Sequence, residues 1–353
     1  MNIIISILIF AIIIVIHEFG HFLLAKLNGV GVIEFAVGMG PKLLSKKIGE
    51  TVYSLRLIPF GGFCSMVGED TPDDKGIDKE KSFAEKSLLR RFSIVIAGPL
   101  FNFLLAFVCA IIYVTMFGTP NPAKVVQVYE NTPAMESGIE VGDVIKSING
   151  RKMASHNDIT EYNVTHGGEE YSIVVDRNGE ELTYTIMPVF SEDTGYYIMG
   201  VSIDATYTTE GRSLGTIFSS SYYEIRNTIR TVFDSFRMLG KGTASVKDMT
   251  GVVGIVDMMG DSVEEANETS GTTGVISFVL YMLIFLSINI GIMNLIPFPA
   301  LDGGRCFIYI IEAITKKTLP RKVEAVINTS GLLFLMGVMV IVLFNDIFRI
   351  VTG

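Results

Sequence analysis

The sequence predicts an α-helical polytopic membrane protein with four transmembrane helices, a membrane-associated β-hairpin and one small extracytoplasmic β domain. Of the 353 residues, 49% are hydrophobic and only 18% are charged, and the mean hydropathy is +0.46. A soluble enzyme of this size would carry more charge. Four stretches are apolar and long enough to span about 30 Å of hydrocarbon. They cover roughly residues 3–24, 92–117, 275–295 and 323–344.

The distribution of charge predicts the topology. Residues 118–274 carry 11 Lys and Arg against 23 Asp and Glu. Basic residues gather in the connections between the first and second and between the third and fourth apolar stretches, where they are Lys42, Lys46, Lys47, Arg90, Arg91, Lys316, Lys317, Arg321 and Lys322. The positive-inside rule places both connections in the cytoplasm, and both termini and the acidic middle outside. Nothing in this pattern indicates nucleic-acid binding.

The first apolar stretch is expected to be a retained helix, because no basic region precedes it and no small-residue cleavage site follows it. Residues 34–63 then contain a partly alternating run at 51–58 and a possible turn at Gly49 and Glu50. This pattern predicts a β-hairpin. Its glycines and apolar side chains indicate that it lies against the membrane or dips into it. Domain 1 of the chain is therefore taken as residues 1–117.

Residues 118–190 predict a small β domain between the second and third helices. The run "SGIEVGDVIKSINGR" at 137–151, with short β-rich stretches on both sides, resembles a PDZ domain. A generic small β domain is the alternative. Residues 191–274 form a linker in which 211–239 has apolar residues at helical spacing. We expect amphipathic helices there, either on the bilayer surface or packed on the β domain. The last unit, 275–353, holds the third and fourth transmembrane helices.

The cysteines give no disulfide framework. Cys64, Cys109 and Cys306 are the only three, and none lies in the long polar middle. Reduced thiols are therefore expected at all three positions.

The first apolar stretch carries an H-E-x-x-H motif. His17 and His21 are four residues apart, so on a helix they project from one face and can bind the same zinc ion. Glu18 is then placed beside the metal to take a proton from water. Unpaired ionisable groups at membrane depth are costly. The motif therefore indicates a metal site.

A catalytic zinc needs three protein ligands and one open position. The other two histidines, His156 and His166, lie in the extracytoplasmic domain. The third apolar stretch ends in "NIGIMNLIPFPALDGGRCF", in which Asp302 is the only acid and prolines and glycines break the helix. Irregular backbone at this depth is tolerated where it is buried in protein or lines a watery cavity. Asp302 is favoured as the third ligand, with a turn residue at the membrane edge as the alternative.

Three motifs taken together resemble the site-2 protease family. They are H-E-F-G-H in the first helix, "AGPLFNF" at 97–103 in the second and N-x-x-P-x-P-x-L-D-G-G in the third. More narrowly, they resemble the bacterial RseP/RasP type of intramembrane zinc metalloprotease. The resemblance covers nearly the whole chain, although some relatives carry two PDZ domains where this chain has room for one. It implies four transmembrane helices, a membrane-associated hairpin and a PDZ insert.

By position, the resemblance implies a set of roles. His17, His21 and Asp302 would be the zinc ligands, with Glu18 as the catalytic base. Asn289 and Asn294 match positions that hold the substrate extended, although an interhelical hydrogen bond is the alternative for each. Gly98 and Asn102 are expected to serve helix packing.

The implied activity is hydrolysis of single-span membrane proteins within or near their transmembrane segment, after a first extracytoplasmic cut. The enzyme would lie in the bacterial cytoplasmic membrane with its active site near the cytoplasmic side. An unwound substrate would add as a strand to the hairpin edge at 53–57, where Tyr53, Ser54 and Leu55 are the expected contacts. The PDZ domain would bind a new C-terminus or exclude untrimmed substrates.

Three other interpretations stay open at this point. One is a different class of H-E-x-x-H membrane protease, for which Glu312 or Glu324 would be the third ligand. Another is a non-catalytic membrane scaffold with a structural metal and a PDZ domain. A transporter also uses broken helices with polar residues, although it would not explain the H-E-x-x-H motif.

Overall fold

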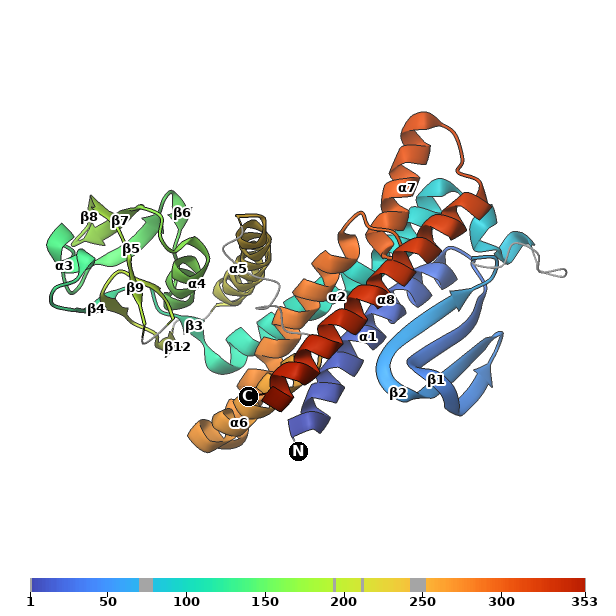
Figure 1. Ribbon diagram of the computed structural model, residues 1–353, viewed down its shortest axis with the longest axis horizontal. Coiled ribbons are helices and arrows are strands. Elements are labelled where there is room, and N and C mark those ends of the chain that lie inside the picture. The colour runs from blue at the N-terminus through green and yellow to red at the C-terminus, as the bar shows by residue number, and fades with distance from the viewer. Residues whose placement is uncertain (1, 70–78, 193–194, 211–212, 242–251, 353) are drawn as a thin grey trace. The chain divides into compact units, whose positions relative to one another are not determined.

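The computed structural model describes residues 2–69, 79–192, 195–210, 213–241 and 252–352. The chain divides into two compact units, each visible in Figure 1. One, here called the helical unit, comprises Met1–Ala110 and Ser245–Gly353. The other, here called the insert domain, is Ile111–Ala244. The three cysteines are free and buried, as predicted.

The helical unit is built on long helices that run in similar directions in Figure 1. They are α1 (Asn2–Leu27), α2 (Leu88–Phe117), α6 (Val252–Leu295) and α8 (Arg321–Thr352). All four are long and apolar enough to cross a membrane. Each contains one of the four predicted stretches. α6 begins well before the predicted residue 275, and it is kinked where Gly271 has a non-helical backbone with φ of 58°.

Two connections in the helical unit contain short helices. α7 (Asp302–Thr315) lies between α6 and α8 and was not predicted as a separate helix. Two 3-10 turns, η1 (Lys79–Lys81) and η2 (Phe83–Glu85), precede α2. α1 and α2 approach closely, since a Cβ on Gly20 would lie 2.5 Å from the carbonyl oxygen of Ala97. Glycine at this position lets the two helices touch.

The predicted hairpin is present, with its turn at Gly49 and Glu50. Its strands β1 (Val32–Ile48) and β2 (Thr51–Met66) are long, and each folds back on itself. The pairing gives four segments in the order 42–48, 51–56, 32–37 and 62–66. The hairpin is therefore a small twisted sheet whose last segment, 62–66, forms one edge.

This register contradicts the predicted hairpin edge at 53–57 for its first three residues. Tyr53 pairs with both Phe35 and Lys46, and the next two residues are paired on both sides in the same way. Their backbone groups are already used by neighbouring strands, so Tyr53, Ser54 and Leu55 cannot accept an added strand. A simple two-stranded hairpin would leave one side of each strand free, whereas here the chain folds back and covers both sides of 53–55.

The insert domain has a four-stranded antiparallel sheet in the order β6-β5-β7-β8. Its core includes Ile145, Ile148, Ile173 and Tyr171, all nearly inaccessible to solvent. The remaining strands pair as β4 with β11, β3 with β12 and β9 with β10. The elements are β3 (Thr119–Pro120), β4 (Val125–Val128), α3 (Pro133–Ser137), β5 (Val144–Ile148), β6 (Arg151–Lys152), α4 (His156–His166), β7 (Tyr171–Arg177), β8 (Glu180–Ile186), β9 (Val189–Ser191), β10 (Tyr196–Ile198), β11 (Val201–Ile203) and β12 (Tyr207–Thr208). These pairings carry the β structure past the predicted limit at 190.

The helix α5 (Leu214–Lys241) packs on α4 of the insert domain. The carboxylate of Glu161 on α4 accepts hydrogen bonds from Asn227 at 2.7 Å and Thr231 at 2.5 Å. Tyr223 also donates to the carbonyl of Lys152 at 3.1 Å. Of the two expectations for 211–239, the structure therefore has the helix packed on the β domain. Of the predicted linker 191–274, residues 193–194, 211–212 and 242–251 lie outside the described residues.

The contact between α4 and α5 is expected to weaken as pH rises. Burial, together with the neighbouring carboxylates of Glu161 and Asp158, raises the pKa of Glu224 from 4.5 to about 7. A raised carboxyl pKa means that the docked helix favours the protonated acid. Its contribution to stability is complete below pH 4.5 and is lost as pH rises through 7. For one such group, local opening should increase roughly tenfold between pH 6 and 8.

Hydrogen exchange of the α5 amides, corrected for the intrinsic effect of pH, measures this opening. The Glu224→Gln variant is the matched control, because an amide keeps the shape of the acid and cannot ionise there. We expect the pH dependence in the native chain to be reduced in this variant. Equal α5 protection at pH 6 and 8 in the native chain would contradict the prediction.

Candidate metal centre

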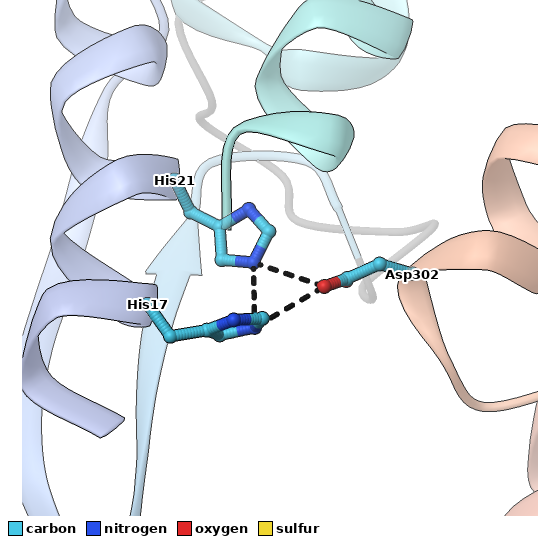
Figure 2. A group of neighbouring side chains, drawn as sticks. All are labelled: His17, His21 and Asp302. Carbon is cyan, nitrogen blue, oxygen red and sulfur yellow. Dashed lines mark hydrogen bonds and ion pairs between the residues drawn. The ribbon is translucent and has the colours of Figure 1, made fainter. Parts of the chain in front are cut away.

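Three predicted ligands meet in the helical unit (Figure 2). His17 and His21 lie one turn apart on α1, and Asp302 is the first residue of α7. The two imidazole Nε2 atoms are 3.3 Å apart. The Asp302 Oδ2 atom lies 3.2 Å from Nε2 of His17 and 3.4 Å from Nε2 of His21. Three potential ligand atoms therefore form a nearly equilateral triangle.

The triangle has the dimensions of a zinc site. Ligand atoms at about 2.0–2.1 Å from a tetrahedral zinc are separated from one another by about 3.3 Å. The Asp302 Oδ2 atom is buried and receives no hydrogen bond, as expected of an oxygen whose natural partner is a cation. Among the described residues the group holds these three ligands and no fourth. Three protein ligands with one open position are typical of a catalytic zinc rather than a structural one.

Hydrogen bonds hold both imidazoles. His21 donates from Nδ1 to the carbonyl oxygen of Ile94 at 2.9 Å, which leaves the lone pair on Nε2 for a metal. His17 Nδ1 lies 3.3 Å from the side-chain amide of Asn102, which is completely buried. The amide nitrogen is the atom that faces His17, and the amide oxygen has no hydrogen-bond partner. Rotating the amide of Asn102 by half a turn exchanges its O and N and points the oxygen at His17. His17 then donates from Nδ1 to that oxygen and presents Nε2 to the metal.

The backbone of α2 lies directly against the imidazoles at Gly98. A Cβ added at this residue would lie 2.3 Å from Nε2 of His21 and 2.8 Å from Cε1 of His17. Gly98 and Asn102 are expected to serve close helix packing. The structure also places both against His17 and His21, the predicted metal ligands.

Two glycines bring Asp302 into the site. A Cβ on Gly303 would lie 2.3 Å from the backbone of Leu295, and a Cβ on Gly304 would lie 2.2 Å from the carbonyl of Phe298. The first turn of α7 therefore presses on the turn that ends α6. Ala300, with φ of 77°, makes the reversal between the two helices. The L-D-G-G sequence is thus a compact turn that aims a carboxylate at α1.

A cavity of about 540 Å³ surrounds the triad. Glu18 lines it next to the ligands, and its carboxylate accepts a hydrogen bond from the backbone N–H of Cys64 on the hairpin. Besides the triad and Glu18, the lining is Phe63, Cys64, Ser65, Met66, Glu69, Val95, Asn294, Ala300 and Arg305. The hairpin edge 62–66 therefore forms one wall of the cavity.

The other predicted substrate residues separate into two groups. Asn294 lines the cavity. Asn289 does not, and its amide donates to the carbonyl of Phe285 on its own helix at 2.8 Å. The hairpin residues Tyr53, Ser54 and Leu55 also lie outside the cavity lining. Ser54, for example, donates to Glu34 at 2.6 Å within the sheet.

The alternative third ligands lie elsewhere. Glu312 forms an ion pair with Arg91 at 3.1 Å, and both Glu312 and Glu324 line a neighbouring pocket. Sequence reasoning missed the cavity-lining residues Phe63, Ser65 and Arg305. The sequence offers two indications of them. Gly61 and Gly62 lie shortly before Phe63 and Ser65, and Arg305 follows Asp302 by about one helical turn.

Known proteins resemble this chain over most of its length. Residues 5–338 match the description of Peptidase family M50. The chain is 32% identical to the zinc metalloprotease RasP of Bacillus licheniformis, over 99% of this chain and 100% of the relative. It is 30% identical to the regulator of sigma-W protease RasP of Bacillus subtilis, over 98% of this chain and 97% of that relative. A protein described as a zinc metalloprotease in Clostridium acetobutylicum is 38% identical to this chain, over 98% of this chain and 97% of that relative.

Among solved structures, the PDZ domain of an SdrC-like protein from Listeria monocytogenes matches part of the chain. The match has 20% identity and a TM-score of 0.22, and covers 24% of this chain and 90% of that structure.

Proposed function

Because the chain belongs to peptidase family M50 and is a zinc metalloprotease of the site-2 protease type, we propose that it cuts single-span membrane proteins within or near their transmembrane segment. The observation that carries this proposal is the position of the triad. His17 and His21 lie inside α1, which is long and apolar enough to cross a membrane. Peptide bonds that reach this site must come from a segment at membrane depth.

The chemistry divides between the metal and the chain. Zinc, when held by His17, His21 and Asp302, supplies a Lewis acid that polarises the scissile carbonyl. Glu18 takes a proton from the attacking water and delivers it to the leaving nitrogen. The Cys64 N–H and the neighbouring hairpin backbone hold the Glu18 carboxylate beside the ligands. Hydrogen bonds from His21 to Ile94 and between His17 and Asn102 keep both rings oriented.

The substrate must be extended to be cut, because helical carbonyls are occupied by hydrogen bonds. We place the added strand at the 62–66 edge of the hairpin rather than at 53–57. This edge lines the metal cavity, whereas 53–55 is paired on both sides. Asn294 faces the same cavity and would hold the substrate from the α6 side. Backbone pairing along an open edge supplies affinity without requiring a particular substrate sequence.

Disulfide cross-linking tests the location of the added strand. A Ser65→Cys variant, without the native cysteines and with Glu18→Gln to prevent cleavage, should cross-link to a cysteine near the scissile bond. The matched control is Leu55→Cys, because Leu55 is 46% exposed and lies in the same sheet away from the cavity. Stronger cross-linking at position 55 than at 65 would contradict the placement.

The chain is a bacterial membrane protein, and we propose that the cytoplasmic membrane holds it with the insert domain outside. The basic residues at both helix connections support this orientation under the positive-inside rule. The active site would then lie nearer the cytoplasmic side. We propose that the insert domain is a PDZ domain that binds a new C-terminus or excludes substrates whose outer domain is untrimmed.

A pair of substrates tests the proposed function. Purified enzyme in detergent is given a single-span protein with a short outer tail, or the same protein with a folded outer domain. We expect the trimmed form to be cut inside its apolar segment, as located by mass spectrometry, and the untrimmed form to be cut much more slowly. Cuts confined to soluble regions would contradict intramembrane cleavage. Equal rates for the two forms would contradict the requirement for a first cut.

A further inference from the structure

A second polar pocket adjoins the metal cavity. It has a volume of about 370 Å³ and lies among η2, α2, α7 and the start of α8. Its lining includes Phe83, Arg91, Tyr309, Thr318 and Asn328. Of the described residues, Glu69 and Arg305 are the two that line both this outer pocket and the metal cavity. Both pockets belong to the helical unit.

These two shared residues form an ion pair. The Arg305 guanidinium donates to the Glu69 carboxylate. Their side chains are 24% and 11% exposed. Glu69 follows the end of β2, whose edge lines the metal cavity, and Arg305 is on α7 one turn after the ligand Asp302. The pair therefore crosses from the hairpin to the helix that carries the third metal ligand, and it stands between the two pockets.

The outer pocket is polar far beyond this pair. Arg91 pairs with Glu312 at 3.1 Å and stacks over the ring of Tyr309 at 4.8 Å. Glu324 and Asn328 add further polar groups from α8. Charged groups among apolar helices are stable where water reaches them. The pocket also includes the last three residues of the connection between α7 and α8, Thr318, Leu319 and Pro320, which follow the basic residues Lys316 and Lys317.

We propose that the Glu69–Arg305 ion pair is a gate between the outer pocket and the metal cavity, through which water reaches the site and the polar end of the product leaves. This inference rests on the proposed function, since hydrolysis consumes one water molecule for each bond. Two flexible side chains suit a gate. When the pair separates, water and the polar groups that line the two pockets can solvate each charge, which offsets part of the cost of breaking the pair. When the pair is closed, it separates the cavity from the outer pocket.

Alkylation of Cys64 measures access to the cavity without requiring cleavage. Cys64 lines the metal cavity and is buried, and burial raises the pKa of its thiol, so its native reaction is slow. The native chain, Arg305→Met and Glu69→Gln are treated with iodoacetamide, a small neutral reagent. Peptide mass spectrometry follows Cys64, with Cys109 inside α2 as the internal reference. We expect both variants to react at Cys64 several-fold faster than the native chain, with Cys109 unchanged.

The two variants remove charges of opposite sign, so an effect of local charge on the thiol would move them in opposite directions. Loss of the partition accelerates both. Arg91→Met is the matched control, because it removes an arginine from the same outer pocket without touching the shared wall. Cys64 should react at the native rate in this control. The exchanged pair Glu69→Arg with Arg305→Glu should restore slow labelling.

Two results would overturn the gate. One is native Cys64 labelling in both Glu69→Gln and Arg305→Met. The other is acceleration in Arg91→Met as large as in Arg305→Met. Faster labelling of Cys109 identifies a variant that has lost its fold. The other single variant and the exchanged pair then decide whether the ion pair limits access to Cys64. If the chain cuts no membrane substrate, the proposed function fails, whereas the labelling result still determines whether the pair separates the pockets.

Discussion

Replacing Gly98 with alanine is expected to remove zinc and abolish proteolysis, although Gly98 is not a ligand. The added methyl group would lie 2.3 Å from Nε2 of His21 and 2.6 Å from its Cε1. Both atoms belong to a ring fixed by its hydrogen bond to Ile94, so the ring cannot retreat without breaking that bond. Residues that only orient metal ligands typically change metal affinity by roughly 10- to 100-fold when mutated. A direct clash with a ligand atom should cost at least as much.

Zinc per chain after dialysis against a fixed free-zinc buffer measures this effect. Gly291→Ala is the matched control, because a Cβ there meets Phe103 at 3.2 Å and Pro99 at 3.4 Å in the same bundle but no imidazole. We expect the control to retain zinc, and Gly98→Ala to lose it together with activity, as Asp302→Ala should. Native zinc content and activity in Gly98→Ala would show that α2 does not press on the ligands.

Hydropathy and local spacing predicted the long apolar helices and the three residues that meet in the candidate metal centre. The four long apolar helices follow from composition alone, because a lipid-spanning helix leaves a continuous apolar run. His17 and His21 were predictable because residues four apart share a helix face. Asp302 was predictable as a lone acid in a broken helix. Each of these inferences needs only local sequence.

Features that depend on long-range contacts were not predicted. The edge at 62–66 follows from segment 32–37 pairing on both sides, which an alternating pattern does not encode. The contact of Gly98 with the imidazoles depends on how closely α1 and α2 pack. The pairing of Glu69 with Arg305 joins residues more than 200 positions apart in the sequence. The contact of Asn102 with His17 joins two different helices, so local sequence does not reveal it.

Replacing Glu18 with glutamine is the second change for which we expect a large loss of activity. The Glu18 carboxylate lies beside the triad. Among the described residues that line the cavity, the other carboxylates are Asp302, which belongs to the triad, and Glu69, which is paired with Arg305. Glutamine keeps the shape and can still accept the Cys64 N–H bond, but it cannot take a proton. Loss of a general base typically lowers a rate by roughly 10²- to 10⁴-fold. Zinc binding should be unchanged, because Glu18 is not in the ligand triangle.

Cleavage of a trimmed single-span substrate by the native chain and by Glu18→Gln, both purified in detergent, tests whether Glu18 is the base at this site. Zinc content is determined on the same samples. We predict product from the native chain, little or none from Glu18→Gln, and equal zinc in both. Equal product from the two proteins would contradict the assignment of Glu18 as the base. It would also contradict the proposed mechanism, in which Glu18 transfers the proton during hydrolysis of the peptide bond.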